Sequence, residues 1–194
     1  MTEKLKILAA AILRSMTYHF QIWAGAAVIA VIALVSWLFL HEADVGTRQA
    51  ADELVRLSGN IRRYYQNRPD FWGLSTDTVI KNKIYPQEML QNGRLNGFFG
   101  NEVLIGRGPD AEVLMPGARG FDIIYKNLNK KQCEELASYK FDEKFWLGIT
   151  GITVGNDKEQ RYFTWSDKEF ALPIKKDFVQ SICKSTNMLI WHCE

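Results

Sequence analysis

The chain has 194 residues, of which 47% are hydrophobic and 24% charged, and its formal net charge at pH 7 is +2. Three of its 24 basic and one of its 22 acidic residues lie in residues 1–40, so the rest of the chain, with 21 of each sign, is neutral. This balance argues against nucleic acid, and against an anionic membrane surface, as a partner of the region after residue 40.

An uncharged apolar run extends from Ile22 to Leu40. About 20 such residues in a helix span the ~30 Å core of a bilayer, which predicts a membrane-spanning helix over residues 22–40. A secretory signal peptide would have ~7 to 15 apolar residues before a small-residue cleavage site, whereas this run ends in Trp37-Leu38-Phe39-Leu40. A buried helix of a soluble core would need protein on every side. We therefore expect a retained, single-pass anchor.

The charges beside the run predict its orientation. All three basic residues of the first 40 precede it, and the first charged residues after it are Glu42 and Asp44. Basic flanks stay on the cytoplasmic side. We therefore expect residues 1–21 to be a cytoplasmic tail and everything after Leu40 to be exported.

Residues 41–66 are expected to be an amphipathic continuation of the same helix. Apolar side chains recur every three or four positions and form one stripe, which we predict to be an assembly surface: Ala50, Leu54, Leu57, Ile61 and Tyr64. The acidic pairs Asp52-Glu53 and Asp142-Glu143 are interpreted as solvated. No proline interrupts residues 1–68, which favours one rod, and two helices with a hinge near Gly46 are the alternative.

Residues 67–194 are expected to form one exported globular domain. The first part should contain helical turns that begin near Ser75 and Pro86. Five glycines between Gly93 and Gly108 predict turns around a short strand near Val103. We expect this segment to be a connection rather than part of the core.

Four later segments are rich in β-branched and aromatic residues and predict strands over 120–125, 145–150, 161–165 and 188–191. Between them, residues 130–139 and 173–185 are expected to be helical. The predicted fold class is α+β: a long N-terminal helix, transmembrane and then amphipathic, packs on a small antiparallel sheet with short flanking helices.

All three cysteines, Cys133, Cys183 and Cys193, follow the predicted span, where an oxidising compartment favours disulfides. Three cysteines allow three single pairings and always leave one thiol over. A structural disulfide is the expectation. His192-Cys193 is a weak hint of a metal site, since no second cluster in the sequence matches it.

The sequence offers no catalytic pattern. Neither His41 nor His192, the two histidines after the span, lies in a nucleophile or metal motif, and the glycines form no phosphate-binding loop. We expect no enzyme activity, no cofactor and no metal.

Several short segments follow the apolar run in a particular order. They are Ile61-Arg62-Arg63-Tyr64-Tyr65, Phe71-Trp72-Gly73-Leu74-Ser75-Thr76, Ile84-Tyr85-Pro86-Gln87-Glu88-Met89, Asn96-Gly97-Phe98-Phe99-Gly100, Phe121-Asp122-Ile123-Ile124-Tyr125 and Asn127-Leu128-Asn129-Lys130-Lys131-Gln132-Cys133. Their order and spacing resemble the type IV pilin superfamily, specifically the type IVb pilins of the PilS type. The resemblance covers about residues 22–183.

The resemblance implies a disulfide between Cys133 and Cys183 and leaves Cys193 as an extra thiol, available for a bond to another chain. It also shows a departure. Such pilins are cut after a glycine just ahead of the apolar segment and carry a glutamate at the fifth position of the mature chain. Here Gly25 is the only glycine before Gly46, and no glutamate lies between Glu3 and Glu42. Processing by the usual rule is therefore not expected.

Two functions follow from this resemblance. The first is a structural, non-catalytic, pilin-like subunit of a type IV pilus or a related conjugation or secretion filament. It would be anchored in the bacterial inner membrane, with its C-terminal domain in the periplasm or in a surface filament. Its partners would be the membrane and other pilin-like subunits or assembly proteins, copies of itself included. The alternative is a non-assembling periplasmic accessory or regulatory protein of such a machine.

Overall fold

A computed structural model describes residues 45–141, 148–156 and 158–194 of the chain. All of them except Val45 belong to one compact unit, Gly46–Glu194. The predicted tail, the predicted span over 22–40 and the Asp142-Glu143 pair lie outside the described residues. Within the described part, no helix is both long and apolar enough to cross a bilayer.

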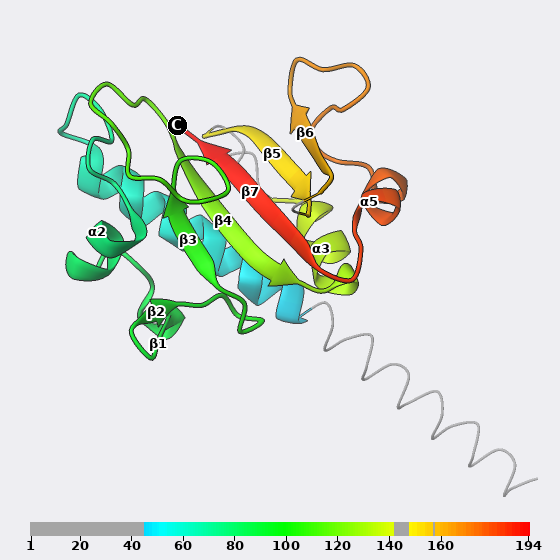
Figure 1. Ribbon diagram of the computed structural model, residues 1–194, viewed down its shortest axis with the longest axis horizontal. Coiled ribbons are helices and arrows are strands. Elements are labelled where there is room, and N and C mark those ends of the chain that lie inside the picture. Colours follow the sequence, from blue (N-terminus) through cyan, green and yellow to red (C-terminus); the bar gives the residue numbers. More distant parts are fainter. Residues whose placement is uncertain (1–44, 142–147, 157) are drawn as a thin grey trace, which may run out of the picture. The chain divides into compact units, whose positions relative to one another are not determined.

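The described chain begins with a helix over residues 45–65, which we call the backing helix (Figure 1). Its predicted apolar stripe faces the core, where Ala50, Leu54, Leu57 and Ile61 are completely buried. The helix has a three-to-four-residue spacing of apolar side chains, so one face packs against the sheet while the others carry charge.

The segment after the backing helix contains short elements. Helix α2 (Thr76–Lys81) begins where predicted, because the Ser75 side chain accepts a hydrogen bond from the Thr78 backbone N–H. The turn predicted at Pro86 is the 3-10 helix η1 (Gln87–Met89). Strands β1 (Leu90–Gln91) and β2 (Arg94–Leu95) form a hairpin, and β3 (Val103–Gly106) confirms the short strand.

The expectation that this segment is a mere connection is wrong. It contributes six side chains to the main core that are 0–1% exposed, namely Leu74, Val79, Met89, Leu95, Val103 and Ile105. These residues are separated by turns and glycines rather than by a regular period. Their burial is therefore set by tertiary packing, which hydrophobic periodicity does not report.

The main sheet has five strands in the order β3-β4-β7-β5-β6, and every neighbouring pair is antiparallel (Figure 1). Its later strands are β4 (Phe121–Leu128), β5 (Ile149–Gly155), β6 (Gln160–Thr164) and β7 (Asn187–Cys193). Strand β7 is longer than the predicted 188–191, and β5 extends beyond the predicted end at residue 150. The last strand in sequence lies at the centre, so this α+β sheet needs its C-terminal strand to be complete.

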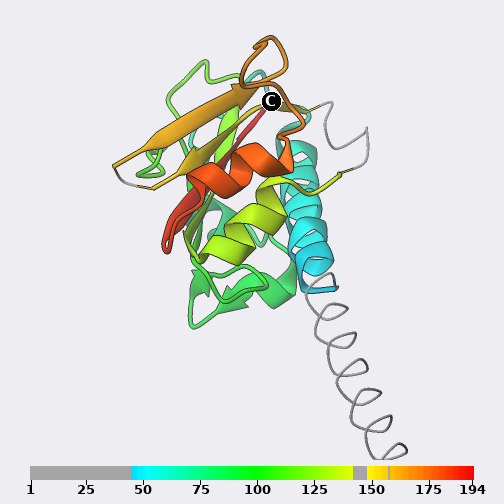
Figure 2. The ribbon, with the colours of Figure 1, turned by 90° about the vertical axis from the view of Figure 1, so that its right-hand side faces the viewer.

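The two faces of the sheet bury different sets of residues. Phe121, Ile123 and Tyr125 of β4 belong to the main core, while Ile124 joins a smaller cluster with Ile190 on the other face. Helices α3 (Lys130–Ala137) and α5 (Lys176–Ile182) contact each other, and α3 also contacts β7 (Figure 2). The predicted helices over 130–139 and 173–185 are thus confirmed in shorter form.

Candidate functional site

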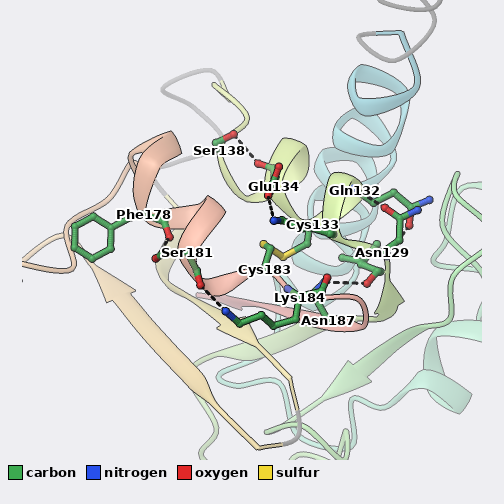
Figure 3. Close-up of a disulfide and its surroundings, with 12 residues drawn as sticks. Asn129, Gln132, Cys133, Glu134, Ser138, Phe178, Ser181, Cys183, Lys184 and Asn187 are labelled. Carbon is green, nitrogen blue, oxygen red and sulfur yellow. Dashed lines mark hydrogen bonds and ion pairs between the residues drawn. A yellow bond between two sulfur atoms is a disulfide. The ribbon is translucent and has the colours of Figure 1, made fainter.

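The C-terminal region contains a disulfide between Cys133 and Cys183, whose Cα atoms are 6.0 Å apart (Figure 3). Cys133 lies in α3, and Cys183 follows the last residue of α5. Both are buried. The pairing implied by the resemblance is confirmed, and the bond joins the two helices beside the sheet.

Helix α3 presents Cys133 because its start is fixed by a reciprocal cap. The Asn129 side chain accepts from the Gln132 backbone N–H at 2.9 Å, and the Gln132 side chain accepts from the Asn129 N–H at 3.0 Å. Such a capping box satisfies two otherwise unpaired backbone donors. The helix therefore begins at Lys130 directly after β4, with Cys133 turned toward α5.

The loop that leads from the disulfide into β7 is held by one buried side chain, Asn187. Its Oδ1 accepts from the Lys184 backbone N–H at 2.6 Å. Its Nδ2 donates to the Lys184 carbonyl at 2.7 Å and to the Leu128 carbonyl at 3.1 Å (Figure 3). Both ends of the amide group are occupied, so residues 184–187 are tied to the end of β4 as well as to α5.

The third cysteine, Cys193, is a free thiol at the end of β7 and is 2% exposed. Burial raises the pKa of this thiol to about 12. The thiolate is the reactive form of cysteine, so Cys193 is unreactive in the folded domain. A bond from it to another chain would require β7 to open.

The predicted assembly stripe occupies two environments. Ala50, Leu54, Leu57 and Ile61 are fully buried within this domain, whereas Tyr64 is 37% exposed. The guanidinium of Arg68 lies 4.8 Å from the centre of the Tyr64 ring, a cation–π distance. A role of the stripe in contacts between subunits stays a prediction. Of the five stripe residues, only Tyr64 leaves part of its side chain exposed for such a contact.

The expectation that the Asp52-Glu53 pair is solvated is wrong for Glu53, and the half-buried Arg62 of the same helix also binds backbone groups of other segments. The Glu53 carboxylate is buried and accepts from the Phe98 backbone N–H at 2.7 Å, and burial raises its pKa. The Arg62 guanidinium donates to the carbonyls of Gly148 at 2.5 Å and Glu194 at 2.7 Å. Amphipathic spacing missed both residues because their partners are backbone groups distant in sequence.

His192 belongs to a row of polar side chains on the sheet face that carries Ile124 and Ile190. Its Nδ1 lies 2.7 Å from Asp122 Oδ1 on β4, and its Nε2 lies 2.9 Å from Thr153 Oγ1 on β5. Asp122 Oδ2 also accepts from the Gly108 backbone N–H. In the described residues no three potential ligands gather into a metal site. The row therefore links strands β4, β7 and β5 through hydrogen bonds. Nothing in the described residues adds to the weak sequence indication of a metal site at His192-Cys193.

A family model described as Bundlin matches residues 44–187 of the chain. Among solved structures, the type IV b pilin from Salmonella typhi has 14% sequence identity and a TM-score of 0.46, over 74% of this chain and 96% of that one. TcpA, a type IV pilin from the Vibrio cholerae El Tor biotype, has 10% identity and a TM-score of 0.44, over 79% and 99%. No match was found among curated protein sequences.

Proposed function

Because the chain belongs to the Bundlin family, which is related to the type IV pilins, we propose that it is a structural subunit of a type IV pilus or of a related conjugation or secretion filament. The observation that carries this proposal is the family match over residues 44–187. Proteins of this kind are structural subunits and not enzymes. The Cys133–Cys183 disulfide supports an exported position, since such bonds persist in oxidising compartments.

We further propose that residues 22–40 anchor the subunit in the bacterial inner membrane, with residues 1–21 in the cytoplasm. The apolar run and the basic residues ahead of it support this topology. The domain from residue 67 onward would then lie in the periplasm before assembly and at the cell surface afterwards. Residues 41–66, which include the backing helix, would link the two parts.

Side chains suited to contact between subunits are present on the described surface. Trp72 is 63% exposed and Met115 is 73% exposed. Backbone hydrogen bonds join the two segments that carry these side chains. The Gly73 N–H donates to the Leu114 carbonyl, and the Leu114 N–H donates to the Leu74 carbonyl. Large apolar side chains that are exposed on a hydrogen-bonded backbone are typical anchors of protein interfaces.

Crosslinking in membranes tests the assembly directly. A Met115→Cys variant of the full-length chain is expressed in its host and treated with a heterobifunctional crosslinker that joins a thiol of one chain to a lysine amine of the next. We expect a ladder of homo-oligomers and the same species in sheared surface filaments. Leu114→Cys is the matched control, since Leu114 is 2% exposed and a thiol there would stay unreactive. Buried Cys193 adds no background.

The second candidate is the non-assembling accessory protein, favoured by the absence of the usual cleavage glycine and fifth-position glutamate. It predicts one discrete crosslinked heteromer, no chain in sheared filaments and an intact N-terminus starting at residue 1. N-terminal sequencing that finds a mature start near residues 18–23 would exclude it in favour of a processed subunit.

A further inference from the structure

A surface hollow of about 510 Å³ opens where three segments of the C-terminal region meet. They are the end of β4, the turn between β5 and β6, and the loop between α5 and β7, and the last two lie on the same side of the domain in Figure 2. Each segment brings one lysine to the lining: Lys126, Lys158 and Lys184. We propose that this hollow, which we call the lysine pocket, binds a phosphate or sulfate ester group.

The charges of the lysine pocket are not neutralised by the described residues around it. No acidic side chain of the described part lines the hollow, and none of the three lysines forms a described ion pair. Asp157, between the lining residues Asn156 and Lys158, lies outside the described residues. Glu159, in the same turn as Lys158, pairs with Arg161 at 3.5 Å. Three lysines line this one concave surface, and their charges add to a positive potential there, which a bound anion would relieve.

The remaining polar lining suits an oxyanion. Ser185 and Thr186 supply hydroxyl groups, and Asn127 supplies an amide. Asn156 uses its Oδ1 to accept from the backbone N–H groups of Lys158 and Glu159, which leaves its amide N–H donors for a ligand. A phosphate or sulfate group carries several acceptor oxygens, and hydrogen bonds from charged donors to such oxygens are strong.

The pocket is built into the fold rather than formed by mobile side chains alone. The β4–β7 register shifts between Tyr125 and Leu128, so Lys126 and Asn127 together oppose Met188. Asn127 takes a left-handed conformation there, with φ 58°. Such a bulge re-aims side chains at the end of a strand.

Lys184 is positioned from the other side. It follows Cys183, whose disulfide to α3 fixes the end of α5, and its backbone is held by buried Asn187 (Figure 3). Its Nζ also donates to the Ser181 carbonyl at 2.8 Å. The disulfide and Asn187 thus preorganise one wall of the pocket, which lowers the entropy cost of binding.

The size of the hollow leaves room for more than the anion itself. Ligand pockets are typically about 300 to 1,000 Å³, and a hollow of about 510 Å³ lies within this range. It can therefore hold the group that bears the ester, such as one sugar ring. Because phosphate and sulfate esters present the same oxygens to the same donors, both are tested.

Isothermal titration of the full-length chain in non-ionic detergent tests the proposal, with glucose 6-phosphate and glucose 6-sulfate as probes. We expect one site per chain and binding that weakens with salt. A Lys126→Gln/Lys158→Gln/Lys184→Gln variant should lose at least about tenfold in affinity, because each lost charge-assisted contact is worth a sizeable part of the 1.4 kcal/mol that a tenfold change requires. The single variant Lys158→Gln, at an exposed turn residue, should lose less affinity than the triple variant. It keeps the test valid if the triple variant does not fold.

The matched control is Lys81→Gln/Lys140→Gln/Lys168→Gln, which removes the same charge from exposed positions outside the pocket. It should bind within about twofold of the unmodified chain, since distant exposed charges are screened. Binding of only one ester supports the pocket and identifies the anion. The absence of binding by both esters, or an equal loss in both triple variants, overturns the proposal.

Discussion

The glycine-rich segment before the main sheet and the C-terminal region after β4 are held in place by different means. From α2 to β3, single apolar residues such as Met89 and Leu95 enter the core between turns, and one helix residue, Glu53, reaches the backbone at Phe98. From α3 to β7, a capped helix and a disulfide constrain the chain before the last strand pairs at the centre of the sheet.

The comparison shows that a segment without a regular spacing of apolar residues can still contribute side chains to the hydrophobic core. The C-terminal region has regular elements and a covalent link, so its stability should depend on the constraint. The glycine-rich segment has only short elements and no covalent link, so its stability should depend on a few individual side chains. Five variants, apart from their controls, separate these two sources of stability. Each is compared with the unmodified full-length chain by its unfolding in detergent.

Removal of the disulfide should have the largest effect. Cys133→Ala/Cys183→Ala is expected to lower the free energy of unfolding by about 4 kcal/mol, because closing a loop of about 50 residues reduces the entropy of the unfolded chain by this amount. Urea titration measures the loss. Cys193→Ala is the control, as it removes a buried thiol without removing a link, and an equal loss in both would contradict the chain-entropy account.

Met89→Ala should destabilise the glycine-rich segment by about 3 kcal/mol, since it leaves a cavity in a close-packed core. Met89 is 0% exposed, while its neighbour Leu90 is 36% exposed. Leu90→Ala is therefore the matched control and should change stability by less than about 0.5 kcal/mol. If both variants behaved alike, the segment would be the loose connection that its composition first indicates.

Two glycines should respond in opposite directions. A Cβ at Gly97 would lie 2.9 Å from the Tyr125 ring and 3.0 Å from Asn101 Oδ1, so Gly97→Ala should cost about 2 kcal/mol through overpacking. Nothing lies within 4 Å of a Cβ at Gly59 in the backing helix. Gly59→Ala should therefore raise stability by up to about 1 kcal/mol through helix propensity. Thermal denaturation would reveal the contrast, and a stabilising Gly97→Ala would refute the close packing.

The smallest expected effect is a pH dependence at Glu53. Burial raises the pKa of this carboxyl above 4.5 in the folded chain, so the folded state binds the proton more tightly than the unfolded state. Its contribution to stability is thus present at low pH and is lost as the pH rises from about 4.5 through the folded pKa. Glu53→Gln keeps an acceptor for Phe98 N–H and should lack this loss.

Denaturation of both proteins between pH 4 and pH 7 measures the difference. The stability of Glu53→Gln relative to the unmodified chain should increase with pH over this interval. Asp52→Gln is the control, because Asp52 is exposed on the same helix and its substitution removes one negative charge without touching the bond between Glu53 and the Phe98 N–H. A parallel course of the unmodified and Glu53→Gln curves would show that Glu53 is solvated after all.

Elements with local signals were predictable. The Ser75 cap, the strand at Val103 and the helix that holds Cys133 follow from hydrogen-bonding side chains and β-branched runs that act within a few residues. The apolar stripe on the backing helix likewise follows from its spacing. The disulfide pairing was not decided by spacing and came from the resemblance to type IVb pilins.

The amino-acid sequence by itself determined the α+β class, the amphipathic helix and the family, because each rests on a pattern that the chain carries locally or in order. Only the tertiary structure decided that β7 pairs between β4 and β5, that Glu53 and Arg62 are bound to distant backbone, and that three lysines share one hollow. These features join residues far apart in sequence. They depend on which strand edges and side chains meet when the core closes, and no local pattern encodes that.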